Sequence, residues 1–220
     1  MKKLLGIAAA LLLSTSAFAG EAWKNFIGFG WRLPTSTKMH AEKQGFDSIK
    51  MPVQTGIDLT YTGVLMSNGF TVRAFIDNNF SNSNVDTPEG SELGYLIGFN
   101  QNLLMGAGWA PIRTDMFFFA FYGMLGYDLT VVTYDSSLFD SNKAKYTDTV
   151  YYASFLPAVN AYFAWTPVKV FSLYASATVG YNCPTFLFRE TEKDNIKTDT
   201  KSLSRGGVKV IPTVGICWKI

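Results

Sequence analysis

Apolar and small or polar residues alternate with a period of two along most of the chain. In Asn25–Leu33, the odd positions from 27 onward hold Ile, Phe, Trp and Leu, whereas the even positions from 28 onward hold Gly, Gly and Arg. Successive side chains of a β-strand point to opposite faces. The pattern therefore predicts a strand with one apolar face and one small or polar face.

The same alternation recurs in eight segments, most of them near or above the ~9–11 residues with which a tilted strand crosses a bilayer. These segments are Trp23–Leu33, Pro52–Thr62, Phe70–Asp77, Leu93–Asn102, Met116–Val132, Val150–Trp165, Phe171–Asn182 and Gly206–Ile220. Long polar connections follow the first, third, fifth and seventh: Pro34–Met51, Asn78–Glu92, Thr133–Thr149 and Cys183–Arg205. Shorter connections with turn residues follow the second, fourth and sixth: Gly63–Gly69, Leu103–Asp115 and Thr166–Val170.

Transmembrane barrels keep short turns on the periplasmic side and long loops outside. The chain is therefore predicted to be an all-β, eight-stranded, antiparallel up-and-down transmembrane β-barrel. Outward aromatic residues at strand ends, such as Trp31, Tyr127 and Trp165, would form interfacial girdles. The alternative is a soluble barrel or sandwich with the apolar face as its core. The small polar residues on the other face argue against it, because a solvent-facing strand surface carries many charges.

Residues Met1–Ala19 read as a cleavable signal peptide, with two lysines, an apolar core and the small-x-small site Ala17–Ala19. A retained anchor helix is the alternative, but the core is shorter than the ~20 residues that a spanning helix needs. We expect residues 20–220 to form one barrel domain in the bacterial cell outer membrane.

The net charge and the two cysteines bear on two further properties, nucleic-acid binding and disulfide formation. The formal net charge of +2 gives no basic stripe for nucleic acid. Cys183 and Cys217 fall near opposite ends of neighbouring strands, which would separate them by roughly 30 Å at ~3.3 Å per residue. A disulfide needs Cα atoms within about 7 Å, so no disulfide is expected.

The signal segment, the eight strands, the alternating connections and the last strand Val208–Ile220 resemble the small eight-stranded outer-membrane proteins. This group includes the OmpX, OmpA-barrel and OmpW/OprG families, and similar small barrels of spirochaetes. The resemblance is architectural and covers the chain after its signal segment. Such barrels usually end in an aromatic residue that the assembly machinery reads, whereas here Trp218 stands two positions before Ile220.

Charged residues fall on the inward register of the predicted barrel: Arg32, Asp58, Arg73, Asp128 and Lys209. The interior of an eight-stranded barrel is just wide enough for side chains to fill. Charges that are shielded from water must be paired. The cluster is therefore interpreted as a structural polar core, and a narrow polar path is the alternative.

Two prolines stand in mid-strand, Pro157 in the sixth and Pro212 in the eighth. A proline removes one ladder donor, and between them the seventh strand presents only Ala175 and Ala177 outward. Local bulges explain this wall, and flat packing against a partner barrel is another possibility. The functional hypothesis is a lateral opening from the lumen into the membrane.

Catalytic and metal chemistry have little support. His40 is the only histidine, and a catalytic histidine needs a nucleophile within hydrogen-bond reach; Ser81 and Ser83 are the candidates. Asp77–Asp86 lacks the glycine and glutamate of a calcium loop, and turn chemistry explains its composition. No cofactor and no metal site are expected.

The resemblance to the OmpW/OprG family implies passage of small hydrophobic solutes, through a narrow lumen or a lateral opening. The alternative function is a surface-exposed structural or adhesion barrel that acts through its extracellular loops. A lipid-modifying barrel enzyme is a remote alternative. The expected partners are outer-membrane lipid and lipopolysaccharide or an equivalent, the barrel-assembly machinery and a small hydrophobic solute. The chain is expected to be a monomer.

Overall fold

The computed structural model describes residues 23–35, 38–41, 49–50, 54–86, 92–135, 146–193 and 196–220. All secondary structure in these residues is strand. The long strands are β1 (Trp23–Thr35), β4 (Gln54–Leu65), β5 (Phe70–Asp86), β6 (Glu92–Arg113), β7 (Phe117–Asp135), β8 (Tyr146–Phe155), β9 (Ala158–Val168), β10 (Phe171–Lys193), β11 (Ile196–Arg205) and β12 (Gly207–Lys219). Two short strands, β2 (Lys38–Ala41) and β3 (Ile49–Lys50), come between β1 and β4 in the sequence.

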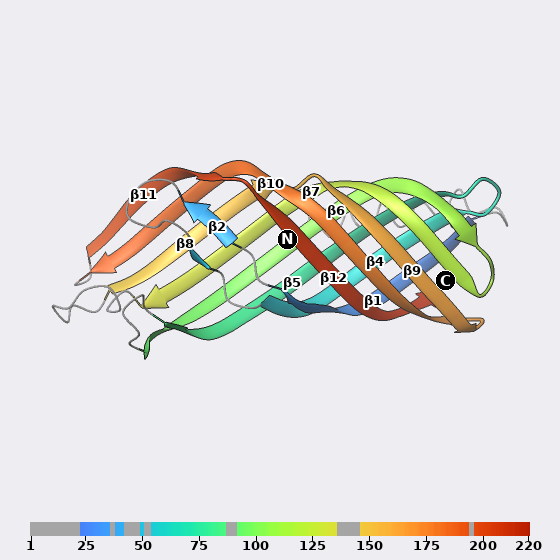
Figure 1. Ribbon diagram of the computed structural model, residues 1–220, viewed down its shortest axis with the longest axis horizontal. Coiled ribbons are helices and arrows are strands. Elements are labelled where there is room, and N and C mark those ends of the chain that lie inside the picture. Colours follow the sequence, from blue (N-terminus) through green and yellow to red (C-terminus); the bar gives the residue numbers. More distant parts are fainter. Residues whose placement is uncertain are drawn as a thin grey trace.

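The strands form a closed antiparallel ring of eight positions (Figure 1). Around the ring stand β1, β4, β5, β6, β7, the pair β8 and β9, β10, and β12, and the ring closes where β12 pairs with β1. The sixth position holds β8 and β9 in succession, because the strand is interrupted at residues 156–157. The prediction of an all-β, eight-stranded, antiparallel barrel is confirmed.

The two ends of the barrel differ as the connection lengths predicted. At one end the strands join through the short turns 66–69, 114–116 and 169–170. Gly69 adopts a φ of 80° there, a conformation that glycine reaches without strain. At the other end the strands extend much further, and β6 and β10 contain 22 and 23 residues. That is about twice what crossing a bilayer requires.

Several predicted strand ends were too short. The third strand continues through Asp86, the fourth through Arg113 and the seventh through Lys193, so the predicted connections Asn78–Glu92, Leu103–Asp115 and Cys183–Arg205 are largely strand. Beyond the bilayer, outward side chains need not be apolar, and the alternation fades. In residues 103–110 both faces are apolar, because Leu104 and Ala110 line an apolar part of the lumen.

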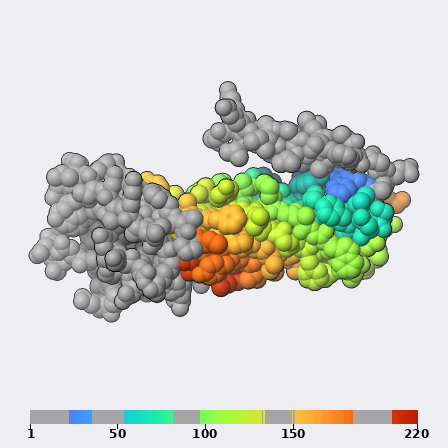
Figure 2. All heavy atoms as spheres, turned by 90° about the horizontal axis from the view of Figure 1, so that it is seen from above, coloured from blue at the N-terminus to red at the C-terminus, as the bar shows by residue number. Residues whose placement is uncertain are grey.

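The outer wall carries an apolar surface. Outward side chains that are large and exposed include Phe29, Leu59, Phe121, Leu125 and Val179. On the face seen in Figure 2, the described part of the barrel is covered by closely packed atoms of neighbouring strands. Tryptophans exposed at or near the strand ends are Trp31, Trp109, Trp165 and Trp218. This arrangement is typical of a lipid-facing belt with interfacial aromatic girdles.

Gly126 stands where strands β6 and β7 approach closely. A Cβ atom there would clash with the backbone oxygen of Leu103, whereas at Gly123 on the same strand nothing lies within 4 Å. We expect Gly126→Ala to lower the free energy of unfolding by about 1–3 kcal/mol, because the backbone must shift to admit the methyl group. Urea unfolding of the protein in vesicles would measure this loss. Gly123→Ala serves as the matched control, and an equal loss in both variants would contradict the argument.

The cysteines are far apart along two neighbouring strands and form no disulfide. Cys217 of β12 is paired with Ser172 near the start of β10, whereas Cys183 lies in the middle of β10, just past its last pair with β12, Asn182 with Gly207. The expected absence of a disulfide agrees with this register.

Candidate functional site

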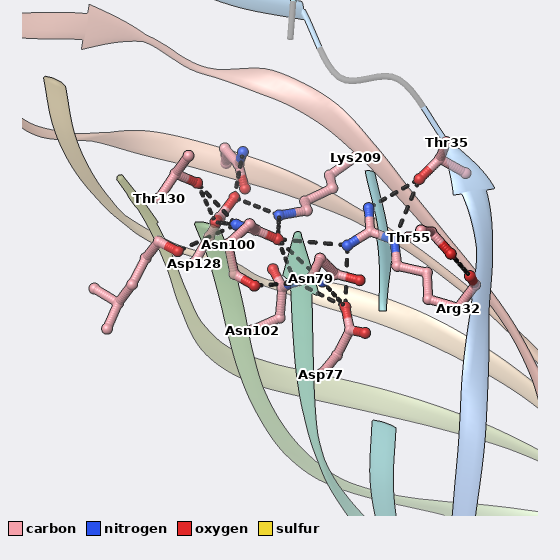
Figure 3. A network of polar contacts seen from close by, with 12 residues as sticks. Arg32, Thr35, Thr55, Asp77, Asn79, Asn100, Asn102, Asp128, Thr130 and Lys209 are labelled. Atoms are coloured by element: carbon pink, nitrogen blue, oxygen red, sulfur yellow. Dashed lines mark hydrogen bonds and ion pairs between the residues drawn. The ribbon is translucent and has the colours of Figure 1, made fainter. Parts of the chain in front are cut away.

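A buried polar network crosses the lumen at the end of the barrel nearer the long connections (Figure 3). It contains the charged residues Arg32, Asp77, Asp128 and Lys209, whose exposed fractions are 2% or less. These residues come from β1, β5, β7 and β12, and Asn100 of β6 lies between them. Side chains from most ring positions therefore meet in the centre, because inward residues of a barrel this narrow reach across the axis.

Arg32 joins β1 to β5. Its Nη1 donates to Asp77 Oδ2 at 3.0 Å and to Asn100 Oδ1 at 3.4 Å. Its Nε and Nη2 both donate to Thr35 Oγ1, at 3.2 and 2.9 Å. The guanidinium group thus holds the end of its own strand as well as the centre of the network.

Lys209 joins β12 to β6 and β7. Its Nζ donates to Asp128 Oδ2 at 2.7 Å and to Asn100 Oδ1 at 3.1 Å. Asp128 also accepts hydrogen bonds from Asn100, from Thr130 at 3.1 Å and from Asn182 at 3.0 Å. The two cations and two carboxylates give the network no net formal charge.

Asp58 and Arg73 lie in a separate layer, closer to the short turns. Asp58 accepts a hydrogen bond from Tyr174. The Arg73 guanidinium lies 4.1 Å from the ring centroid of Tyr162 and donates to Thr62 Oγ1 at 3.1 Å. A guanidinium at this distance from a ring face is held by cation–π attraction. The five sequence-predicted lumen residues are thus all buried, but they fall into two layers.

Several residues of the network were not among the predicted lumen residues, among them Asp77, Asn79, Asn102 and Asn182. Asp77 and Asn102 stood at predicted strand ends, and Asn79 lay in a predicted connection. The alternation of inward and outward positions continues past the predicted end of this strand, because the odd positions 77, 79 and 81 of β5 are all buried. Polar residues on both faces concealed the alternation.

The wall around Pro157 is hydrogen-bonded on both sides. The Leu156 N–H donates to the Gly126 oxygen at 2.8 Å, on the β7 side. The Tyr181 N–H donates to the Pro157 oxygen at 3.0 Å, on the β10 side. The interruption between β8 and β9 therefore leaves the sixth position attached to both of its neighbours.

Pro212 lies in β12, and its pairing differs on the two sides. On the β10 side the register continues without a break through Ala177 and Pro212, and Ala175 and Ala177 point outward to the exposed surface. On the β1 side, pairing stops at Arg32 and Thr213. Among the described residues, Leu33–Thr35 pair with none of the β12 residues Val210–Pro212. We call this stretch the β1–β12 gap.

The nitrogen of Pro212 faces this gap. The Lys219 N–H donates to Val170 on the β10 side, and the Ile220 N–H donates to Asn25 on the β1 side. Successive residues of an antiparallel strand direct their backbone groups to opposite neighbours. Because the register is constant from Lys219 to Pro212, the backbone groups of Pro212 point toward β1, where proline has no N–H to donate.

Beyond the gap, β2 and β11 pair in the register that the β1–β12 ladder would have if it continued. His40 of β2 pairs with Arg205 of β11, and Ala41 pairs with Ser204. The side chains of His40 and Ser83 lie outside the described residues, whereas Ser81 is buried on the lumen side of β5. Asp77–Asp86 belongs to β5 and forms no turn, which corrects the turn interpretation of that segment.

Within the described ranges, no group of three or more His, Cys, Asp or Glu side chains is arranged to hold a metal ion. In the same part of the chain, no helix is long and apolar enough to cross a membrane.

No family model matches the chain, and no curated protein matches it in sequence. Its fold is similar to the crystal structure of a major outer membrane protein from Thermus thermophilus, with a TM-score of 0.64 at 12% identity over 90% of this chain and 99% of that one. The chain has the fold of a small outer-membrane β-barrel. Weaker matches are OprG from Pseudomonas aeruginosa (TM-score 0.49, 16% identity, 90% and 95% of the two chains) and Ail, the attachment invasion locus protein of Yersinia pestis (0.46, 14%, 90% and 97%).

This outer-membrane barrel has both features that its environment requires. The closed ring pairs its strands without a free edge over most of the bilayer, and the outward side chains are apolar. Localisation in the bacterial outer membrane agrees with the fold and with this lipid-facing surface.

Proposed function

We propose that the barrel passes small hydrophobic solutes that carry a polar group from the outer side into the membrane, through the β1–β12 gap. The function is non-enzymatic, the barrel acts as a monomer, and its partners are the solute and the surrounding outer-membrane lipid. The observation that carries the proposal is the end of β1–β12 pairing at Arg32 and Thr213, beside an irregularity in the β1–β4 pairing between Arg32 and Thr35.

The position of the gap supports this role. A strand crosses the bilayer in ~9–11 residues, and counting from Lys219 this length ends near Val210. The gap therefore lies in the outermost part of the membrane-spanning wall. A solute leaving here enters the outer leaflet, where the outward neighbours are apolar, with Val208 66% and Val210 45% exposed.

The polar network supports a lateral route over a route along the axis. Arg32 and Lys209 flank the gap on its two strands, and both are bonded to Asn100 in the centre of the lumen. The network crosses the lumen at the level of the gap with buried ion pairs. A solute from outside thus meets a hydrogen-bonding floor and an unpaired wall beside it, which suits a molecule with both apolar surface and a polar group.

Pro212→Val tests the gap directly. The valine supplies an N–H that faces Leu33, so we expect the β1–β12 ladder to extend and uptake of the hydrophobic probe N-phenylnaphthylamine into expressing cells to fall by about half or more, since one ladder bond is restored. Probe fluorescence in cells measures the uptake, with cells lacking the protein as baseline. Pro157→Val is the matched control, because the wall there is already bonded on both sides.

Equal uptake in the wild type and in cells without the protein, with the folded barrel present in the outer membrane, would contradict the proposal. That result would favour the second candidate, a surface barrel that acts through its outer part. A specific observation supports this candidate. The β10–β11 hairpin pairs from Phe186 and Leu203 to Lys193 and Ile196, well beyond the length needed to cross a bilayer.

A further inference from the structure

A cavity of about 270 Å³ opens at the end of the barrel with the short turns. Its inner walls are apolar: Val64, Phe118 and Ala164 are buried on three different strands, and Phe26 of β1 is packed against them. The ring centroids of Phe26 and Phe118 are 6.2 Å apart. The volume is slightly below the ~300–1,000 Å³ of pockets for drug-sized ligands.

Tyr162 closes the inner end of the cavity. Its ring packs edge-on against Phe118, with centroids 5.9 Å apart, and the Arg73 guanidinium, which is not among the lining residues, lies over its face. The cavity is thus separated from the polar network and from the β1–β12 gap by the layer that contains Arg73. Its rim is formed by residues at the end with the short turns, Thr114, Asp115 and Lys169 among them.

The rim of the cavity is cationic. Lys24 and Lys219 occupy inward positions on β1 and β12, and Lys169 lies in the turn between β9 and β10. Asp115 is the single acid among the lining residues, and Lys24 Nζ lies 3.0 Å from its Oδ1. The hydrogen bond and charge of Lys24, with smaller effects of Lys219 and Lys169, lower the pKa of Asp115. All three lysines therefore surround one carboxylate and exceed it in charge by two.

We propose that this cavity binds a single-chain anionic amphiphile, with the anionic head at Lys24, Lys169 and Lys219 and the apolar tail between Phe26, Phe118 and Ala164. An apolar cavity alone takes any small hydrophobic molecule, and a cationic rim alone takes any anion. Their combination selects a molecule with one charged end and one short chain. A carboxylate head and a phosphate head fit the rim equally well. Binding of such a molecule does not depend on the passage of solutes through the β1–β12 gap.

The test uses the full barrel in bilayer nanodiscs and lauric acid with a diazirine at the end of its chain. After illumination, mass spectrometry locates the labelled residues and measures the competition by unlabelled compounds. We expect labelling of the strands that carry Phe26, Phe118 and Ala164. Lauric acid and dodecyl phosphate should compete, whereas dodecanol and inorganic phosphate should compete about tenfold more weakly, because each lacks one half of the recognised chemistry.

Variants separate the tail site from the head site. Ala164→Leu fills the cavity and should weaken labelling about tenfold, whereas Ala161→Leu, on the lipid-facing side of the same strand, should not. Lys169→Met combined with Lys219→Met should weaken competition by lauric acid and leave that by dodecanol unchanged. Asp115→Asn removes the competing carboxylate and should strengthen lauric acid binding.

Labelling confined to lipid-facing residues, or unchanged by Ala164→Leu, would overturn the proposal. Equal competition by lauric acid and dodecanol would reduce the site to a nonspecific apolar cavity and would likewise overturn it. Neither result bears on uptake through the β1–β12 gap, since the two regions lie on opposite sides of the Arg73 layer.

Discussion

Replacing Asp128 by asparagine is expected to lower the free energy of unfolding by about 3–5 kcal/mol, the usual cost of removing one partner of a buried ion pair. Lys209 Nζ lies 2.7 Å from Asp128 Oδ2, and both side chains are 2% exposed. The asparagine keeps the shape but leaves the ammonium group without its counter-charge. Urea unfolding in lipid vesicles, followed by tryptophan fluorescence, measures the loss.

A double variant identifies the cause. Asp128→Asn combined with Lys209→Met removes the unpaired charge, so we expect it to recover more than half of the stability lost in the single variant. Asp115→Asn is the exposed control, since the Asp115 side chain is 97% exposed and surface pairs contribute little. If Asp128→Asn unfolds at the same urea concentration as the wild type, the network does not hold the barrel together.

The eight ring positions could be predicted from the sequence because the outward side chains contact lipid and the inward ones contact each other. This requirement produces the alternation in β1 and in the bilayer part of β10. It ends where the wall leaves the membrane, and the sequences of β5 beyond Asp77 and of β10 beyond Asn182 no longer alternate between apolar and polar residues. The strand ends were therefore short on the long-connection side. On the short-turn side, β6 runs to Arg113 beyond its predicted end at Asn102, whereas the turns 66–69 and 169–170 fell within the predicted connections.

The candidate site was only partly predictable for a different reason. Position parity places Arg32, Asp128 and Lys209 inside the barrel, but it carries no information on which of them meet across the lumen. That depends on where each side chain reaches as well as on register, since Asp58 and Asp77 are cross-strand partners, yet Asp77 binds Arg32 and Asp58 binds Tyr174. Parity also does not reveal which neighbour a proline faces.

The two prolines illustrate this limit. Pro157 and Pro212 have equivalent positions in the sequence pattern, and the predicted opening lay between them. In the structure, β10 is paired with β9 up to Ala158 and with β12 through Pro212. The unpaired stretch lies on the far side of Pro212, where Arg32 binds Thr35 and β1 leaves the β12 ladder. The opening that we propose is therefore in the closing pair of the barrel.

Linking the two edges of the β1–β12 gap is expected to abolish uptake. Leu33 and Pro212 are the positions that would pair next if the ladder continued, so Leu33→Cys with Pro212→Cys, in a Cys183→Ser and Cys217→Ser background, places two thiols on the facing edges. Oxidation, or a short bifunctional thiol reagent where the edges exceed the ~7 Å limit of a disulfide, should reduce N-phenylnaphthylamine uptake to that of cells without the protein. Cleaving the disulfide with a reductant should return uptake to that of the same variant before oxidation, which the N–H gained at position 212 already places below the wild type.

The matched control is Phe29→Cys with Ile216→Cys in the same background. These residues already face each other in the β1–β12 ladder, and Cα atoms of hydrogen-bonded antiparallel pairs lie ~5.5 Å apart, within disulfide range. Cross-linking here closes nothing that was open, so uptake should not change. Uptake that persists in the cross-linked Leu33–Pro212 protein would place the route elsewhere. A loss in both cross-linked proteins would show that rigidity of the closing pair, and not the gap, controls uptake.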